Sequence, residues 1–365
     1  MNKKVLLIIS VLLILAGCSL NEPVNTENVR PTISVSENSL AYVSDEQIYV
    51  HDINQGKIYN ITDDQLTHSS PLWVEAGKRL VYITKRNDFY ELWEHDLQAS
   101  DKQLIWGSKE PALFTNISND RLWLVYAEAD GCFLINRKEK KVQRFADKCE
   151  QVAWAKDDKK FVYIQNDTLY LLEINLQLEI DKPTTLYSGE INSPVFLDNK
   201  TLAFVSVNIN EPEEIADSEN QNPDTETEPE IITQPDTYDV YQLSLIDKSS
   251  QRITNINFSE LGENYLEFSP NQDYLVLNHL VSEPQTWLIN YSETKTAKQI
   301  LSNVNEVVWS VKGDQIYYVS NVEPNAKQPI YSLMSASKDG LNKKEISPDA
   351  TQIIFFHNLK NQLSY

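Results

Sequence analysis

A pattern that returns about every forty residues constrains the fold of this chain more than any other feature. The segment SSPLWVEAGKRLVYIT, which begins at Ser69, has counterparts in QVAWAKDDKKFVYIQ, NSPVFLDNKTLAFVS, YLEFSPNQDYLVLN and EVVWSVKGDQIYYVS, with weaker copies in ALFTNISNDRLWLVYA and PTISVSENSLAYVS. Each copy has an anchor residue, a polar turn and an alternating apolar run. The anchors are Val35, Trp73, Phe114, Trp154, Phe196, Phe268 and Trp309. Self-similarity at a fixed period indicates a repeat architecture.

Successive anchors lie 38, 41, 40, 42, 72 and 41 residues apart. Each interval contains four strand-like runs, such as residues 79–83 with alternating apolar side chains and residues 48–52 with a central aromatic. Four strands every ~40 residues is the period of a β-propeller blade. We therefore expect an all-β propeller of seven four-stranded antiparallel blades, with six or eight as alternatives. Residues 352–356 are expected to pair with an N-terminal blade, which would close the ring and hide a sheet edge.

The copies resemble the blades of TolB-like (WD40-like) propellers, which read Ser-Pro-x-Trp-Ser-Pro-Asp-Gly-Lys before an apolar strand. The spacing of the repeats matches this family over about residues 31–350. The segments closest to the family motif in sequence are SPNQ from Ser269 and SVKG from Ser310. The same blade type occurs beside the hydrolase domain of prolyl-oligopeptidase-like peptidases. That domain needs a Gly-x-Ser-x-Gly elbow, and this chain has none.

Residues 1–17 read as a lipoprotein signal peptide. Two lysines precede an apolar run that is too short to span a bilayer stably, and the run ends in Leu-Ala-Gly-Cys18, which resembles a lipobox. An ordinary secretory signal is the alternative. We expect Cys18 to carry acyl chains and residues 18–30 to form a flexible tether. The remaining residues, 31–365, would form the propeller domain.

The formal net charge of the chain is −21, and removal of Lys3 and Lys4 with the signal peptide makes it −21 − 2 = −23. Such a surface repels nucleic acid and anionic lipid headgroups. Nucleic acid is therefore excluded as a partner, and contact with the membrane should run through the lipid alone. We expect a bacterial cell-envelope location. Residue 19 is Ser rather than Asp, which by the proteobacterial sorting rule implies the outer membrane, facing the periplasm or the surface, in a Gram-negative host.

Two cysteines remain after cleavage, Cys132 and Cys149. The strand pattern puts them on or beside neighbouring strands, and an exported compartment permits a disulfide. A bridge and two separate thiols both stay open. No Cys/His spacing matches a zinc site, and no metal or other cofactor is expected.

The abnormal spacing of 72 residues is caused by an insertion at about residues 208–237. Nine carboxylates lie between Glu211 and Glu230, and there is no Lys or Arg between Lys200 and Lys248. This composition predicts a solvated, disordered loop. The alternatives are a docking segment for a basic partner and weak binding of divalent cations, although no chelating Asp-x-Asp-x-Asp-Gly loop is present. The candidate binding residues are Glu211, Glu213, Glu214 and Asp217.

The loops between second and third strands, and between fourth and first strands, share one face of a propeller, called the top face below. The insertion belongs there, and so does His68, with Asp63, Asp64 and Ser69 nearby. These four residues could contact a ligand or partner, but we expect His68 to be a solvent-exposed histidine without such a role. Trp106 departs from the anchor pattern and is the candidate for an exposed aromatic contact.

The spacing of Ser, His and Asp suggests no catalytic set. The leading hypothesis is therefore a non-catalytic, lipid-anchored propeller of the cell envelope that presents its acidic top face to another protein. The rival hypothesis is an enzyme or small-ligand binder, for a sugar or a peptide, that uses the central channel of the propeller.

Overall fold

The computed structural model describes residues 33–36, 39–75, 77–174, 182–208, 237–293, 295–310, 312–321 and 331–350. The signal peptide, Cys18, the tether, the acidic insertion and residues 352–356 lie outside these ranges. Within the described ranges all the regular elements are strands, and no helix long and apolar enough to cross a membrane occurs there.

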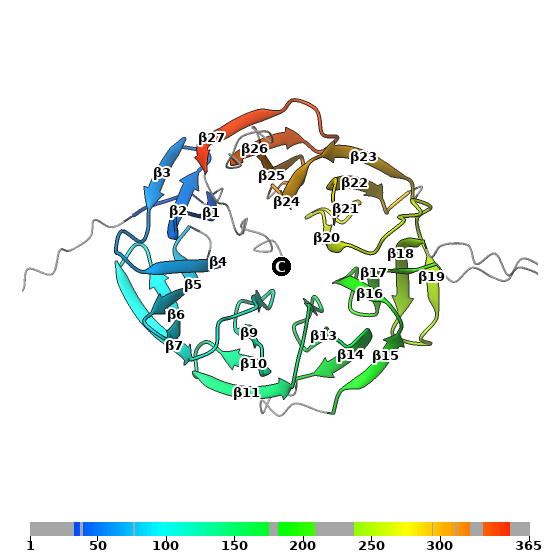
Figure 1. The fold of residues 1–365 in the computed structure, drawn as a ribbon, viewed down its shortest axis with the longest axis horizontal. Helices are drawn as coiled ribbons and strands as arrows, with labels where there is room; N and C mark the ends of the chain where they lie inside the picture. The colour runs from blue at the N-terminus through cyan, green and yellow to red at the C-terminus, as the bar shows by residue number, and fades with distance from the viewer. Residues whose placement is uncertain are drawn as a thin grey trace, which may run out of the picture.

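The strands form seven sheets arranged as blades around a ring (Figure 1). Blade 1 consists of β1 (Ser39–Ser44), β2 (Gln47–Asp52) and β3 (Lys57–Asn60). Blade 2 consists of β4 (Thr67–Glu75), β5 (Arg79–Arg86), β6 (Phe89–Asp96) and β7 (Asp101–Ser108). Blade 3 consists of β8 (Phe114–Ile117), β9 (Trp123–Glu128), β10 (Gly131–Asn136) and β11 (Lys141–Ala146). Blade 4 consists of β12 (Val152–Trp154), β13 (Lys160–Gln165), β14 (Thr168–Glu173) and β15 (Thr184–Ser188).

Blade 5 consists of β16 (Ile191–Phe196), β17 (Thr201–Val207), β18 (Tyr238–Ser244) and β19 (Ser250–Arg252). Blade 6 consists of β20 (Glu263–Phe268), β21 (Tyr274–Leu280), β22 (Gln285–Asn290) and β23 (Ala297–Ser302). Blade 7 consists of β24 (Val304–Trp309), β25 (Gln315–Asn321), β26 (Tyr331–Ser337) and β27 (Lys344–Ala350). The expectation of a seven-bladed antiparallel propeller is therefore confirmed.

Alternation along the second strand of each blade explains how the blades pack. In β5, Leu80 and Tyr82 join the apolar cluster shared with blade 1, whereas Val81 and Ile83 join the cluster shared with blade 3. Successive strand side chains point to opposite faces, so a continuous apolar run fills both interfaces at once. The tryptophan anchors close these interfaces from the inner strands: Trp73, Trp154 and Trp309 are 3%, 7% and 0% exposed.

Two anchors differ from the expectation. Phe114 begins β8 rather than ending the inner strand of its blade, and it is half-buried. Val35 is buried but does not lie in a strand. The backbone N–H of Ile33 donates instead to the carbonyl of Leu97 in blade 2, and Ser36 bonds to the carboxylate of Asp52. Blade 1 therefore has three strands among the described residues, where the other six blades have four.

Cys132, in β10, and Cys149, just before β12, form a disulfide with their Cα atoms 6.1 Å apart. Both half-cystines lie in the apolar cluster between blades 3 and 4. The bridge therefore ties the third strand of blade 3 to the segment that leads into the innermost strand of blade 4.

Candidate functional site on the top face

Two of the four residues grouped around His68, namely His68 itself and Asp64, form a small polar centre at the seam between blades 1 and 2. His68 and Ser69 lie at the start of β4, and Asp64 lies in the connection from β3. The imidazole Nε2 of His68 is 2.7 Å from Asp64 Oδ1, and its Nδ1 is 3.0 Å from Thr84 Oγ1. Ser69 and Asp63 take no part in these two bonds. The sequence did not indicate Thr84, which lies on another strand.

His68 is 2% exposed, which differs from the solvent-exposed histidine expected from the sequence. Both ring nitrogens are hydrogen-bonded, and the ring meets Tyr82 edge to face at 5.7 Å. An ionised carboxylate only accepts, so Nε2 carries a proton and donates it to Asp64. The physical reason for the burial is that these bonds replace the water that an exposed imidazole would need.

The pKa of Asp64 is lowered from its ordinary value, although burial alone would raise it. The hydrogen bond from His68, a bond from the backbone N–H of Leu66 and the positive charges of His68 and Lys102 outweigh the burial. Asp64 therefore stays ionised in the folded protein, and its side chain is 36% exposed. It is the part of this centre that a partner could reach.

A cleft of about 100 Å³ opens beside the imidazole. Ligand pockets for whole small molecules usually measure roughly 300–1,000 Å³, so this cleft admits only a small chemical group. Its walls are aromatic and its charged groups are of both signs. The lining residues are Asp64, Leu66, His68, Tyr82, Thr84, Arg86, Trp93 and Lys102.

A hydroxyl, an imidazole and a carboxylate in a row have the connectivity of a nucleophilic triad. Thr84 is only 3% exposed, and its Oγ1 is bonded to the imidazole. The arrangement fits a hydrogen-bonded link between the β3–β4 connection and β5. Within the ranges that the structure describes, no three His, Cys, Asp or Glu side chains come together as a metal site.

Trp106 lies in β7 and is half-buried, with its ring 5.9 Å from that of Phe133 in the next blade. It belongs to the apolar contact between blades 2 and 3 and not to an exposed aromatic site. An exposed aromatic of this region is Phe89, the first residue of β6. It is 46% exposed, and Lys109 Nζ lies 6.0 Å from the centre of its ring. The signal for Phe89 was its position directly after the turn of residues 87–88, at the top-face end of β6, away from the blade interfaces.

The candidate acidic residues Glu211, Glu213, Glu214 and Asp217 lie outside the described residues, but the base of their insertion is well defined. Asn208 follows β17 and Thr237 precedes β18. The backbone N–H of Asn208 donates to the carbonyl of Thr237 at 2.6 Å, and its side-chain amide donates to Thr237 Oγ1 at 2.7 Å. The two ends of the insertion are therefore joined directly.

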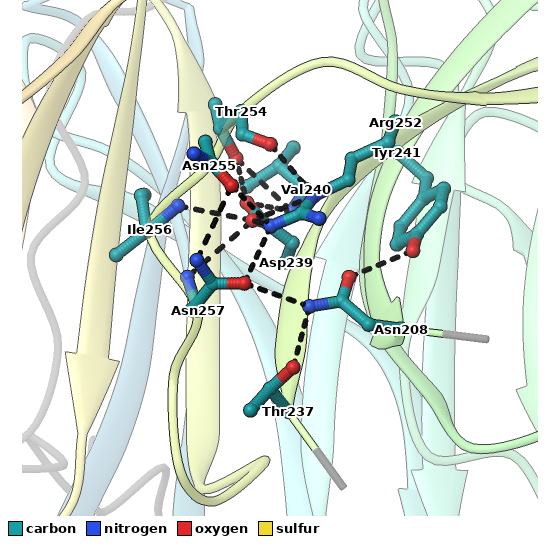
Figure 2. A network of polar contacts seen from close by, with 10 residues as sticks. All are labelled: Asn208, Thr237, Asp239, Val240, Tyr241, Arg252, Thr254, Asn255, Ile256 and Asn257. Carbon is teal, nitrogen blue, oxygen red and sulfur yellow. Dashed lines mark hydrogen bonds and ion pairs between the residues drawn. The ribbon is translucent and has the colours of Figure 1, made fainter. Parts of the chain in front are cut away.

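A polar network centred on Asp239 holds this base in place (Figure 2). Asp239 is fully buried, and its Oδ2 accepts from Arg252 Nη2 at 2.6 Å and Nε at 3.0 Å. The same oxygen accepts from the backbone N–H of Ile256 at 2.9 Å, while Oδ1 accepts from Val240 N–H and from the Thr254 hydroxyl. A buried carboxylate is tolerated because its lone pairs are filled in this way.

The network also reaches the insertion itself. Asn257 Oδ1 accepts from Arg252 Nη2 at 2.6 Å and from the Asn208 amide at 3.3 Å. The hydroxyl of Tyr241 donates to Asn208 Oδ1 at 2.7 Å. One end of the acidic insertion is thereby attached to β18 and to the connection between blades 5 and 6. Sequence reasoning missed this network, because its members share no motif and meet only through the fold.

Comparison with solved structures places this architecture among known propellers. The chain resembles an oligogalacturonate lyase determined in complex with manganese, at 9% identity and a TM-score of 0.55, over 86% of each chain. It also resembles a functionally unknown protein from Desulfotomaculum acetoxidans, at 9% identity and a TM-score of 0.58, over 87% of this chain and 98% of that one. The chain is a seven-bladed β-propeller.

TolB from Acinetobacter baumannii is also similar, at 12% identity and a TM-score of 0.49, over 84% of this chain and 77% of TolB. At identities this low, the likeness concerns the fold and not the activity. No protein-family model and no curated protein sequence matches the chain.

Proposed function

We propose that this protein is a lipid-anchored cell-envelope propeller that acts as a non-catalytic scaffold and binds another protein through its acidic top face. The observation that carries the proposal is the insertion in blade 5. It concentrates nine carboxylates between Glu211 and Glu230, and it leaves the propeller from a base that Asp239 and Arg252 hold in place. A loop that served no purpose would not need a base built from a buried carboxylate and its six donors.

The charge supports a basic partner. The formal net charge of the whole chain is −21, and residues 201–247 contain no Lys or Arg. Complementary charge raises the rate of association and disfavours acidic competitors. Binding should therefore weaken as ionic strength rises, since the Debye length falls from about 10 Å at 0.1 M salt to about 3 Å at 1 M.

The test compares three forms of the chain as baits against an envelope extract, with recovered proteins quantified by mass spectrometry at low and high salt. The first is the native chain, the second lacks residues 209–236, and the third keeps the full length but has the nine carboxylates from Glu211 to Glu230 changed to amides. A partner recovered by the native chain and lost by both variants supports the proposal. Equal recovery of every protein by all three would contradict it.

The lipid anchor is proposed on the basis of the Leu-Ala-Gly-Cys18 sequence after a short apolar run. Mass spectrometry of the mature protein should find Cys18 at the N-terminus with acyl chains attached, and Cys18→Ser should move the protein out of the membrane fraction. Recovery of Cys18→Ser in the membrane fraction at the native level would contradict this part of the proposal.

The second candidate function is binding or turnover of a small ligand in the central channel. The observation that favours it is the likeness in fold to the oligogalacturonate lyase. A thermal-shift screen with sugars, short peptides and divalent ions separates the two proposals, because a ligand at 100 times its Kd stabilises the native state by about 2.7 kcal/mol. A specific shift that survives deletion of residues 209–236 would favour the channel over the acidic face.

A further inference from the structure

The described turns at the two ends of the blades carry opposite charge. The top face consists of the turns between second and third strands and the connections between blades, with β1 in the place of the second strand in blade 1. Within the described ranges these segments contain 13 Asp or Glu and two Lys, a formal charge of −11 without the acidic insertion. The turns between first and second strands and between third and fourth strands form the opposite, bottom face. Their described residues include 14 Lys or Arg and 10 Asp or Glu, a formal charge of +4.

The length of the strands keeps these two sets of charges apart. Strands of six to eight residues, such as β13 and β5, are roughly 20–27 Å long at ~3.3 Å per residue. The Debye length at physiological ionic strength is only about 8 Å. A charged surface that lies close to the bottom face therefore interacts with the basic turns, while the acidic turns are screened from it. The expectation that the membrane is contacted through the lipid alone rests on the net charge and omits this asymmetry.

The chain enters the propeller at the bottom face. The backbone N–H of Ile33 donates to the carbonyl of Leu97, which lies in the turn between β6 and β7. Ser36 is bonded to the carboxylate of Asp52, the last residue of β2, where the turn to β3 begins. Cys18 precedes Ile33 by 15 residues, and a chain of this length reaches at most about 54 Å. An anchor at Cys18 is therefore connected directly to the bottom face.

Two turns of the bottom face combine an exposed apolar side chain with a lysine. Ile246, in the turn between β18 and β19, is 75% exposed, and Leu341, in the turn between β26 and β27, is 60% exposed. Lys248 and Lys343 each follow the apolar residue by two positions and are exposed. Apolar side chains enter the headgroup region of a bilayer, and neighbouring lysines are attracted to anionic lipids. Leu113 is equally exposed on the top face, but the charge of that face repels such a surface.

We propose that the bottom face of the anchored protein lies against an anionic lipid surface, with Ile246 and Leu341 at the headgroups. The acidic top face then points away from the membrane, toward the compartment in which its partner is found. This inference rests on the lipid anchor of the proposed function, and it adds a second membrane contact and a fixed orientation. The attraction per Lys or Arg near an anionic surface falls off within a Debye length, so the contact should weaken as salt is raised.

Fluorescence quenching by the lipid tests the orientation. Ile246→Cys and Leu113→Cys each add one free thiol to the full acylated chain, because Cys132 and Cys149 are joined in a disulfide. Each thiol is labelled with a small fluorophore, and the protein is reconstituted into phosphatidylcholine and phosphatidylglycerol vesicles (about 7:3) whose headgroups carry a spin-label quencher. Quenching at residue 246 should exceed quenching at residue 113 by about threefold or more, and the ratio should fall toward one in 1 M salt, where the Debye length is about 3 Å. Equal quenching at low salt, or stronger quenching at residue 113, would overturn the proposal.

Charge reversal shows whether the basic turns cause this orientation. Lys200→Glu with Lys343→Glu changes two exposed lysines of the bottom face, and Lys109→Glu with Lys148→Glu changes two exposed lysines of the top face. The bottom-face pair should abolish most of the preferential quenching at residue 246, whereas the top-face pair should leave it at the native level. An equal effect of the two pairs would show that total charge, and not the bottom face, governs the contact, and would contradict the proposal.

A second form of attachment separates this inference from the lipid anchor itself. The chain from Ser19, with a hexahistidine at its N-terminus, is bound to the same vesicles through a nickel-chelating lipid, so its orientation is measured without acyl chains. Preferential quenching at residue 246 in this form supports the inference even where mass spectrometry finds Cys18 unmodified. Protection of residue 246 that appears only at high protein density, without quenching by the lipid, would identify a second copy as the occupant of the bottom face and overturn the proposal.

Discussion

Arg252→Met is the substitution that most directly tests the physics of the insertion's base. It removes two charge-assisted hydrogen bonds to Asp239 Oδ2, at 2.6 and 3.0 Å, and leaves a fully buried carboxylate without its cation. Breaking a buried ion pair typically costs about 3–5 kcal/mol. The side chain of Arg252 is 35% exposed, so water replaces part of the lost interaction. We therefore expect the free energy of unfolding to fall by about 2–3 kcal/mol.

Asp239→Asn should cost more, about 3–4 kcal/mol, because its amide nitrogen would face backbone donors that now point at a carboxylate. A propeller of this length has an unfolding entropy of about 0.7 kcal/mol per kelvin. Arg252→Met should then lower Tm by about 3–4 °C and Asp239→Asn by about 4–6 °C. Calorimetry on the two variants, on the double variant and on Glu260→Gln measures these shifts. Glu260 is the control, an exposed carboxylate in the connection between blades 5 and 6.

The double variant decides whether the two residues act together. Residues in one network are not additive, and the double variant should lose less stability than the sum of the two single losses, by about 1–2 kcal/mol. Strict additivity would refute the account of Asp239 and Arg252 as a coupled pair. The account would also fail if the Tm of Arg252→Met differed from that of the native protein by no more than the Tm of Glu260→Gln does.

Three further perturbations probe other parts of the fold. Replacing Cys132 and Cys149 by Ser should cost about 3 kcal/mol, the value for closing a loop of about this length in the unfolded chain, and reductant should lower the Tm of the native protein alone. Burial raises the pKa of Asp158 to about 6, so this carboxyl loses its proton at lower pH in the unfolded chain than in the folded protein. The free energy of unfolding should therefore fall as pH rises from about 4 to 6, and it should depend less on pH in Asp158→Asn, as measured by denaturation across that window. His68→Ala should cost about 2–3 kcal/mol in urea denaturation, and NMR titration should find the pKa of Asp64 raised once the imidazole bond is gone.

Most of the fold could be predicted from the sequence because blade packing depends on a repeated pattern and not on particular residues. Leu80 to Ile83 fill two interfaces simply by alternating, and an anchor such as Trp73 needs only to be large and apolar. The pattern failed at residues 33–36, where an apolar alternation resembles a strand but the backbone of Ile33 bonds to another blade. Local sequence does not contain that contact.

The candidate site was predictable only in part, for a related reason. His68 and Asp64 are four residues apart, so their proximity could be inferred, but Thr84 comes from another strand and its bond buries the imidazole. Asp239 and Arg252 are 13 residues apart, on the third and fourth strands of blade 5, and no motif marks them. The β18–β19 ladder places Arg252 opposite Tyr241, two residues from Asp239. The further donors Ile256 and Asn257 come from the connection between blades 5 and 6, whose path only the tertiary structure determines.

Two blades depart from the repeat: blade 1 has three strands among the described residues, and blade 5 has a long connection between its second and third strands. A turn of two residues joins β1 to β2, whereas residues 208–237 separate the corresponding strands of blade 5. Closing a loop of that length instead of a two-residue turn costs about 2 kcal/mol more in chain entropy. This is close to the contribution expected from the Asp239–Arg252 pair. The network therefore lets blade 5 carry a long acidic segment without losing the pairing of β17 with β18, and the stability lost in Arg252→Met should be partly recovered when the insertion is replaced by a two-residue turn.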